Sequence, residues 1–514
     1  MKIGTMPLGI EAGGKLIVVM DNETAEDLGI RSLDRIRINY GEKRIIAIVN
    51  VASNLPRNVL GIYDEVRLGL GVKEGEEVDI QPAEKPESMT FIREKVDGHR
   101  LSAPGIRAIV LDVLEHHLSD VELASFITAL DIWGLSMEEV EALTRAMVET
   151  GEAIDWGKNR IFDKHSIGGV PGDKTTLLVV PIIASAGLTI PKTSSRAVTS
   201  PAGTADRAEV LCPVDLTIEE IREVVAKTNG CMVWGGALAL APADDLFINV
   251  EYSLSLDPLL LASIMSKKKA IGSSDVLIDI PLGVGAKVRT PEGSHDLATD
   301  FIELGRRLGI HVECAVTSGE QPIGYAVGPA LEAREALQTL IGKGSRDLLE
   351  KATSLAGIIL EMAGLERGKS TAAKLVRSGK AERKLREIIS AQGGDPEIKP
   401  DGIAIGDKHE KFSSDRRGRV TSISNASIAQ IAREAGAPKD KGAGVLLKAK
   451  LGDEVAKGES LFDIYAEKSW KMEVAVALAE SLSPIGVGKR IEGRMLVDRI
   501  PMKVATKKPF LLER

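Results

Sequence analysis

The sequence predicts an α/β protein with an added helical domain, a small β domain and an α+β domain. From about residue 160, apolar runs that suit buried strands alternate with helical periodicity, which is typical of a largely parallel sheet covered by helices. The first 84 residues contain short β-branched runs, and the residues after about 412 mix short strands with one helix. The length of 514 residues independently predicts about three domains.

Residues 1–84 are predicted to form a small β-rich domain. The strand candidates are separated by Gly, Asn and Asp, and they are 15–21, 35–40, 43–52, 65–70 and 77–83. The stretch 82–86 begins and ends with proline and is predicted to be a linker. This domain offers no cluster of reactive side chains, so we expect it to serve assembly or substrate gating.

Residues 87–158 are predicted to form a helical domain. Three segments begin with a serine suited to cap a helix and then repeat apolar residues at helical spacing, and they are 102–118, 119–134 and 136–151. Ser136 is followed by Glu139, which is the capping-box pattern. A helix at 256–272 is expected to return to this domain, so residues 240–272 are grouped with it.

An α/β domain is predicted over 159–239 and 273–411. Its strand candidates are 175–185, 188–194, 231–236, 275–283, 311–318 and 325–328, and its helix candidates are 217–229, 294–309 and 330–342. An α+β domain follows at 412–514, with a helix at 426–436. Its strand candidates are 418–424, 444–450, 459–466 and 471–478.

Composition excludes several functional classes. The net charge of −8 argues against a general nucleic-acid binder, whose binding face is strongly basic. The three cysteines form no CxxC pair, and the seven histidines show neither HxxxH nor HExxH spacing, so a disulfide framework or a zinc site is not expected. No apolar run reaches membrane-spanning length and the first residues lack a signal-peptide pattern, so we expect a cytoplasmic protein.

Two loops rich in Gly, Ser, Thr and Lys, at 164–176 and 192–206, flank the apolar segment 177–190. They offer backbone N–H groups, hydroxyls and ammonium groups, an inventory that suits phosphate. Two such loops predict two anions or one large phosphorylated ligand. Neither loop has the spacing of a Rossmann site or a P-loop, and a plain strand-to-helix turn explains the first loop equally well. Gly203 in the second loop permits close backbone approach.

Other polar residues have competing interpretations. Lys164 and His165 could bring a cation and an imidazole to the mouth of the loops, although a single histidine is more often a satisfied residue near the surface. The run Lys267–Lys269 is favoured as a solvated helix face over a phosphate site. Asp257 is either a helix cap or a carboxylic acid kept protonated by its neighbours.

From about residue 88 to the C-terminus, the chain resembles the thymidine and pyrimidine-nucleoside phosphorylase family. The likeness rests on KHSIGGVPGD at 164–173, SSRAVTSPAGTAD at 194–206 and ASIMSKK at 262–268. Further matching segments are 330–337, 355–364, 391–396 and 451–466. Within the family the chain is most similar to the archaeal AMP phosphorylases, which share the PKTSSRAVTS and APADD stretches and carry an extra N-terminal β domain.

This resemblance implies an activity. AMP and inorganic phosphate would give adenine and α-D-ribose 1,5-bisphosphate, with CMP and UMP as further substrates and with no metal or organic cofactor. It also implies a homodimer core that the N-terminal domain could extend to a higher homo-oligomer. Single displacement by phosphate would invert the anomeric carbon, and positioning and electrostatics would supply most of the catalysis.

The resemblance assigns roles to particular residues. Asp257 is the expected proton donor to the departing base, although the segment between it and Ser263 is two residues shorter than is usual in the family. The residues expected to bind inorganic phosphate are Lys164, Ser166, Thr176 and Ser194. The residues expected to bind AMP are Gly169, Ser195, Arg196, Ala197, Val198, Thr199, Ser200, Thr204, Ser263 and Lys287.

Three alternatives remain at this point. An ordinary pyrimidine-nucleoside phosphorylase would lack the N-terminal β domain and would have less capacity for a 5′-phosphate in its second loop. An anthranilate phosphoribosyltransferase would need acidic magnesium ligands, for which Asp244-Asp245 is the candidate pair, although we interpret that pair as structural. A non-enzymatic assembly protein built on the N-terminal domain is the third class.

Overall fold

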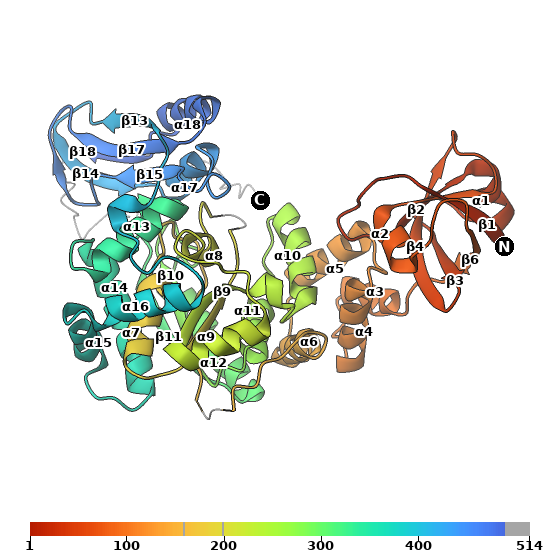
Figure 1. The fold of residues 1–514 in the computed structure, drawn as a ribbon, viewed down its shortest axis with the longest axis horizontal. Coiled ribbons are helices and arrows are strands. Elements are labelled where there is room, and N and C mark those ends of the chain that lie inside the picture. Colours follow the sequence, from red (N-terminus) through yellow and green to blue (C-terminus); the bar gives the residue numbers. More distant parts are fainter. Residues whose placement is uncertain (158–159, 198–199, 489–514) are drawn as a thin grey trace, which may run out of the picture.

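The computed structural model describes residues 1–157, 160–197 and 200–488. The molecule is elongated, with an N-terminal barrel at one end and a C-terminal α+β unit at the other (Figure 1). A helical unit and an α/β domain lie between them (Figure 1). No helix within these described ranges is long and apolar enough to cross a membrane.

The N-terminal unit is a closed six-stranded barrel with the strand order β1-β5-β2-β4-β3-β6. Its elements are β1 (Lys2–Pro7), β2 (Ile17–Asp21), α1 (Asn22–Leu28), β3 (Arg35–Tyr40), β4 (Lys43–Ala52), β5 (Val59–Ile62), α2 (Asp64–Leu70) and β6 (Glu77–Ala83). The strand predicted at 65–70 is wrong, because this segment is α2. Val66 and Leu70 are buried while Leu68 is 67% exposed. Only a helix places residues four apart on one face and the residue between them on the other.

The helical unit contains α3 (Ser88–Val96), α4 (Ala103–Leu114), α5 (Asp120–Trp133), α6 (Met137–Glu149), α10 (Pro242–Leu254) and α11 (Leu260–Ala270). The serine caps predicted for α4, α5 and α6 are confirmed, because each side chain accepts a hydrogen bond from a backbone N–H of the first turn. The capping box at Ser136 and Glu139 is also present. The later helices return to this unit, since α10 packs on α4 and α5, and α11 packs on α6.

Five parallel strands form the centre of the α/β domain. The strands β11, β10 and β7 pair in that order, and β8 pairs with β9. The two groups meet edge to edge, because the Phe162 N–H donates to the Thr189 carbonyl at 2.9 Å. The strands are β7 (Phe162–Ser166), β8 (Ile190–Ser194), β9 (Gly230–Trp234), β10 (Asp275–Leu282) and β11 (His311–Ser318).

Helices cover both faces of this sheet. They are α7 (Thr176–Ser185), α8 (Thr204–Ala208), α9 (Ile218–Thr228), α12 (Pro291–Leu308), α13 (Pro329–Leu340), α14 (Arg346–Met362), α15 (Gly368–Arg377) and α16 (Lys380–Ala391), and two short 3-10 turns lie at Gly235–Leu238 and Pro400–Gly402. The strand β10 shows the layering, because Leu277 packs into the core with α7 and α13–α16, while Ile278 packs into the core of the helical unit. Alternate residues of a strand face opposite sides, so both faces must be apolar.

The predicted strand at 175–185 is wrong, because this segment is the helix α7. Every residue from Thr176 to Ala184 is buried. A run that is apolar on all sides has no period, so a buried strand and a buried helix give the same pattern. Its burial, which the composition predicted, is confirmed, and its conformation is set by the surrounding helices.

Up to residue 488, the C-terminal unit contains two antiparallel sheets and two helices. Its elements are β12 (Ala326–Val327), β13 (Lys408–Ser413), β14 (Gly418–Ile423), α17 (Asn425–Glu434), β15 (Gly444–Leu447), β16 (Glu454–Val455), β17 (Ser460–Ala466), α18 (Ser469–Leu482) and β18 (Ile485–Gly488). The strand predicted at 471–478 is wrong, because it lies in α18, where Ala475 and Ala479 are buried four residues apart. The strand predicted at 325–328 exists as β12 but pairs with β15 of this unit, not with the parallel sheet.

Candidate active site

The first polar loop runs from the end of β7 to the start of α7, so its ends are held by the sheet and by a buried helix. The Lys164 ammonium group donates to the Thr175 hydroxyl at 3.0 Å and lies 3.6 Å from Asp279 and 3.9 Å from Asp173. Lys351 pairs with the same two carboxylates, at 2.9 Å from Asp279. Lys164 was predicted to bind phosphate, and the structure places it in a buried cluster of alternating charges.

Two other residues predicted to bind phosphate lie beside this cluster. The Ser166 hydroxyl is buried at the end of β7 and has no hydrogen-bond partner among the described residues. A buried hydroxyl without a partner costs about 1–3 kcal/mol, so it indicates a place for a polar ligand. Thr176 is the first residue of α7, and the next two N–H groups of this turn, those of Leu177 and Leu178, already donate to the carbonyls of Lys174 and Thr175.

A second set of buried charges lies behind the loops. The Asp163 carboxylate is 2.5 Å from the Lys268 ammonium group and 3.3 Å from that of Lys192. Burial lowers the pKa of Lys192, and the positive charges of Lys268 and Lys164 lower it further. The negative charge of Asp163 raises it but does not outweigh them. Burial and the same lysines hold the pKa of His165 well below its usual value, which keeps its imidazole neutral.

The expectation of a solvated helix face at Lys267–Lys269 is wrong. Lys268 is 1% exposed and pairs with Asp163, Lys267 binds Asp244, and Lys269 donates to a backbone carbonyl. Lysines adjacent in a helix point in different directions, so each one meets a different neighbour.

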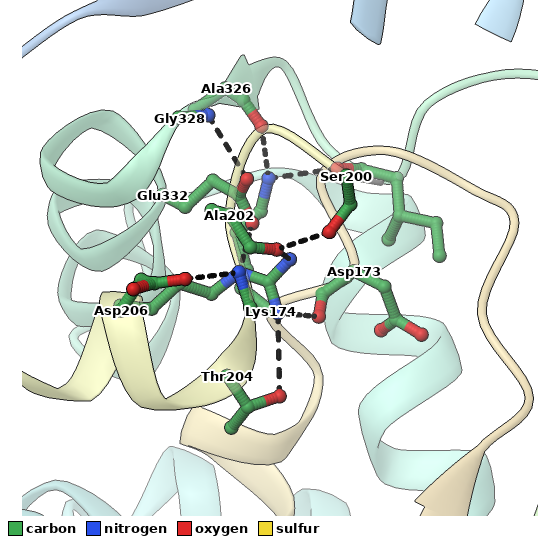
Figure 2. A network of polar contacts seen from close by, with 12 residues as sticks. Asp173, Lys174, Ser200, Ala202, Thr204, Asp206, Ala326, Gly328 and Glu332 are labelled. Atoms are coloured by element: carbon green, nitrogen blue, oxygen red, sulfur yellow. Dashed lines mark hydrogen bonds and ion pairs between the residues drawn. The ribbon is translucent and has the colours of Figure 1, made fainter. Parts of the chain in front are cut away.

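The second polar loop folds back on itself. A Cβ atom at Gly203 would lie 2.5 Å from the Arg196 carbonyl carbon and 2.6 Å from the Ala197 nitrogen, which confirms that this position needs glycine for close backbone approach. Asp206 accepts hydrogen bonds from the N–H groups of Ala197 at 2.7 Å and Gly203 at 2.8 Å (Figure 2 labels Asp206). The Ala197 N–H group, which was predicted to bind AMP, is therefore occupied by an internal carboxylate.

Arg196 is also held within the protein. Its guanidinium makes two hydrogen bonds to Glu209, at 2.9 and 2.7 Å, and lies over the Trp234 ring at 4.9 Å. The hydrogen bonds from Arg196 lower the pKa of Glu209 to about 2, although burial acts in the opposite direction. Lys441 of the C-terminal unit pairs with the same glutamate, so the second loop is tied to that unit. In this structure the Arg196 guanidinium is therefore engaged by protein carboxylates.

The hydroxyl residues of the second loop occupy several positions. Ser194 ends β8 and donates to the Val233 carbonyl at 3.3 Å. Ser200 donates to the Ala202 carbonyl at 3.1 Å (Figure 2). Thr204 starts α8, and Ser195 is exposed beside it in the loop. Val198 and Thr199, which were predicted to bind AMP, lie outside the described residues.

Asp257 and Lys287 form an exposed pair beside the first loop, and this pair is called the mouth of the site. The Asp257 carboxylate lies 2.5 Å from the Lys287 ammonium group. The Gly169 backbone passes close to that of Lys287, because a Cβ atom at Gly169 would lie 2.7 Å from the main-chain nitrogen of Lys287. The φ of +91° at Gly169 also favours glycine. The alternative that Asp257 caps a helix is wrong, since α11 begins after Leu259 without a side-chain cap.

Ser263, on α11, belongs to a neighbouring cluster. Its hydroxyl donates to Asp244 at 2.9 Å, and Lys267 lies 2.6 Å from the same carboxylate. Asp244 is fully buried, and its companion Asp245 is 3.5 Å from Lys267. The acidic pair thus holds a serine and a lysine on one helix face, which fits the structural interpretation.

Glu251 is a site residue that the sequence did not predict. It lies on α10, is 4% exposed, and accepts a hydrogen bond from the Leu259 N–H at 3.0 Å. Burial, followed by the charges of Asp257 and Asp244, raises the pKa of Glu251 to about 7, although the Leu259 N–H and Lys287 oppose the shift. No sequence signal could have found it, because a single glutamate within a helical segment usually faces solvent.

Among the described residues, Asp112, Glu115 and His117 form one group that could hold a metal ion. The imidazole Nδ1 is already 2.9 Å from Asp112 and 3.3 Å from Glu115, which is an ordinary histidine–carboxylate contact. This group lies at the C-terminal end of α4 beside the barrel, where Arg35 donates to the His117 carbonyl. It belongs to the contact between two units of the chain and contributes nothing to the loops.

The assembled region can hold anions and exchange protons. Two loops present hydroxyls, buried lysines supply positive charge behind them, and an exposed carboxylate–ammonium pair lies at the mouth. This combination suits a reaction between an anionic nucleophile and a phosphorylated substrate whose leaving group takes up a proton.

Three family models match the chain. A glycosyl transferase family helical bundle domain matches residues 89–151, and the α/β domain of the same family matches residues 158–382. The pyrimidine nucleoside phosphorylase C-terminal domain matches residues 419–486. A solved anthranilate phosphoribosyltransferase from Thermus thermophilus covers 59% of this chain and 98% of its own, with a TM-score of 0.50 and 19% identity. That likeness concerns the fold alone.

Curated relatives match over almost the whole length. The AMP phosphorylase of Thermococcus kodakarensis is 51% identical over 94% of this chain and 96% of its own. The AMP phosphorylase of Thermofilum pendens is 47% identical over 97% of this chain and 98% of its own. That of Methanocaldococcus jannaschii is 50% identical over 93% of this chain and 96% of its own. The match includes the N-terminal barrel, which the family models leave uncovered. The chain therefore belongs to the AMP phosphorylase family.

Proposed function

We propose that this protein catalyses the phosphorolysis of AMP to adenine and α-D-ribose 1,5-bisphosphate. An oxygen of inorganic phosphate forms a bond to C1′ while the C1′–N bond breaks. The bond's electron pair leaves with adenine, which takes up a proton. The observation that carries the proposal is the Asp257–Lys287 pair beside Gly169, because it brings an acid and an ammonium group to the edge of a phosphate-binding loop.

Inorganic phosphate is assigned to the first loop and the end of β8. Its ligands are the hydroxyls of Ser166, Thr176 and Ser194, with Lys164 supplying positive charge from behind. The partnerless Ser166 hydroxyl supports this assignment, because a phosphate oxygen would give it a hydrogen bond. The neutral imidazole of His165 adds no charge but can donate or accept a hydrogen bond.

AMP is assigned to the second loop and to the mouth of the site. Ser195, Ser200 and Thr204 offer hydroxyls to its ribose and 5′-phosphate. Arg196 and Ser263 contribute after exchanging their partners, Glu209 and Asp244. The roles of Ala197, Val198 and Thr199 rest on the family resemblance alone.

Lys287 is proposed to change partners when AMP binds. It pairs with Asp257, and the 5′-phosphate competes for the same ammonium group with a larger negative charge. Once the lysine turns to the phosphate, the Asp257 carboxyl group loses its ion-pair partner and can turn to the departing base. Asp257 can then carry a proton to the departing base, so substrate binding prepares the acid.

The wider properties are proposals of the same kind. CMP and UMP are proposed as further substrates, and no metal or organic cofactor is assigned a step. A homodimer core is proposed, with the barrel supporting a higher oligomer. The barrel lies at one end of the molecule (Figure 1) and is fixed to the helical unit by the Lys15–Asp120 ion pair at 2.5 Å. A cytoplasmic location stays a prediction of the sequence.

The test is phosphate-dependent release of adenine from AMP, with adenosine measured in parallel. We expect release from AMP, far slower release from adenosine, and a product with phosphate on both C1 and C5 of ribose by ³¹P NMR. Release from nucleosides but not from AMP would make the protein a nucleoside phosphorylase and would remove the assignment of a 5′-phosphate site.

A further inference from the structure

We propose that Arg207 is a positioning residue that sets the spacing between the two polar loops. The inference rests on the proposed function, because loop spacing matters only if one loop holds phosphate and the other holds AMP. Arg207 lies on α8, directly after the second loop, and is 6% exposed. Figure 2 labels four residues that Arg207 contacts, Asp173, Ala202, Thr204 and Glu332.

The guanidinium binds the main chain of both loops. Its Nη1 donates to the Asp173 carbonyl of the first loop at 2.7 Å. Its Nη2 donates to the Ala202 carbonyl of the second loop at 2.7 Å, and Nη1 also reaches the Thr204 hydroxyl at 3.4 Å. Contacts to carbonyl groups fix the path of the backbone, so they fix the side chains on both loops together.

Glu332 of α13 holds the guanidinium in place. Its Oε2 lies 2.5 Å from Arg207 Nε in an ion pair, although the N–H does not point along the contact. The other carboxylate oxygen accepts the Gly328 N–H at 3.0 Å. Glu332 is fully buried, and burial raises its pKa while Arg207 and Lys174 oppose the shift. With Glu332 on one side and two loop carbonyls on the other, the guanidinium is held in a single place.

Lys174 makes a parallel connection for the first loop. Its ammonium group donates to the carbonyls of Ile323 and Ala326, both at 2.8 Å, and pairs with Glu335 of α13 at 2.7 Å. The helix α13 therefore supports the first loop through Lys174 and both loops through Arg207. Among the described residues of this network, Arg207 is the one that joins the first loop to the second, through the carbonyls of Asp173 and Ala202.

The chemistry requires this spacing to be accurate. Attack needs the phosphate oxygen about 3–3.5 Å from C1′, and a displacement of about 1 Å can cost about 100-fold in rate. Lysine cannot replace the arginine, because its ammonium is a single point donor, whereas the guanidinium presents donors in a planar fork. The buried Glu332 would also be left with a weaker partner.

Two variants test the role by kinetics and binding, and Arg207→Ala is added for chemical rescue. Arg207→Lys keeps the charge but loses the fork. A double variant, Arg207→Met with Glu332→Gln, removes both charges and so avoids an unpaired buried carboxylate. The matched control is Arg386→Lys on α16, because Arg386 also pairs with a glutamate, Glu382, and donates to the carbonyls of Pro396 and Ile398. AMP and phosphate are varied independently, and thermal midpoints and calorimetric binding of each ligand are measured.

We expect both Arg207 variants to stay folded and to lose about 10- to 100-fold in kcat, with a raised KM for phosphate, while the control keeps wild-type kinetics. In Arg207→Ala, millimolar guanidinium should restore part of the activity. The same addition should leave the activity of Arg386→Ala unchanged. Folded variants with wild-type kinetics and no response to guanidinium would overturn the proposal. So would unfolding of every Arg207 variant, which would assign the cluster to stability.

Failure of the proposed function gives a different result. A wild-type protein that binds AMP and phosphate without releasing adenine would refute phosphorolysis. Calorimetry would still test the loop spacing, because the Arg207 variants should weaken simultaneous binding of the two ligands more than binding of either one alone. Equal weakening of all three binding events would overturn the positioning role.

Discussion

The Asp257 carboxylate lies 2.5 Å from the Lys287 ammonium group, although the two residues belong to different units of the chain. Asp257 precedes α11 of the helical unit, and Lys287 follows β10 of the α/β domain. Their side chains are 44% and 43% exposed, so a substrate can reach both. The pair therefore bridges the two surfaces that bound the candidate active site.

Lys287→Met should reduce kcat/KM for AMP by about 10- to 100-fold, because a charge-assisted contact to the 5′-phosphate contributes about 1.5–3 kcal/mol. The slow turnover of adenosine should change little, since adenosine has no 5′-phosphate. Lys343→Met, at an exposed lysine between α13 and α14, serves as the control. Equal losses for both substrates would remove Lys287 from the 5′-phosphate site.

Asp257→Asn should lower kcat for AMP by about 10²- to 10⁴-fold, because the amide cannot donate the proton of a carboxylic acid. AMP binding measured by calorimetry should persist. p-Nitrophenyl ribofuranoside 5-phosphate offers a sharper comparison, since its leaving group departs without a proton and should be released at a similar rate by both proteins. Asp131→Asn, at an exposed position on α5, is the control. Undiminished turnover of AMP would exclude Asp257 as the acid.

Glu251→Gln should stabilise the protein at alkaline pH only. The pKa of Glu251 is raised from 4.5 to about 7 in the folded chain, so its contribution to stability is complete below the unfolded value and is lost as pH rises through about 7. The glutamine variant should match the wild type near pH 4.5 and exceed it at pH 8.5, by up to about 3 kcal/mol. Urea unfolding at both pH values measures this, with Glu219→Gln on the surface of α9 as control. The same difference at both pH values would contradict the assignment.

Gly203→Ala should disable the second loop. Its Cβ atom would meet backbone atoms of Ser195, Arg196 and Ala197 at 2.5–2.6 Å, and the backbone cannot yield without moving the loop. We expect about a 100-fold loss of activity and a lower thermal midpoint. Gly402→Ala places its Cβ in open space and should be neutral in both measurements. Wild-type KM values in the Gly203 variant would show that the loop tolerates the shift.

Much of the fold could be predicted from periodicity. The helices α4, α5 and α6 and the strands β10 and β11 lie close to their expected ranges, because each shows helical spacing of apolar residues or a short β-branched run between turn residues. The errors at 65–70 and 471–478 share one cause. Both segments alternate apolar and polar residues over a short span, yet their buried residues are four apart, which periodicity alone could not separate from a strand.

The candidate site was predicted in composition but not in its pairings. The loops at 164–176 and 192–206 were identified by their small and hydroxyl residues. Arg196, however, is held by Glu209, and Lys164 lies among carboxylates. Glu251 and Arg207 carried no signal, because their importance comes from burial beside residues that are distant in sequence.

The sequence by itself determined which segments are apolar and where the serine-capped helices α4, α5 and α6 begin, and it predicted which side chains would hold phosphate. Those properties are local, since capping, periodicity and composition act within a few residues. Tertiary structure decided that α7 is a helix, that Lys268 is buried against Asp163, and that Arg207 connects both loops to Glu332. Each of these depends on desolvation and on partners far along the chain, because a buried charge is tolerated only where the fold supplies its opposite.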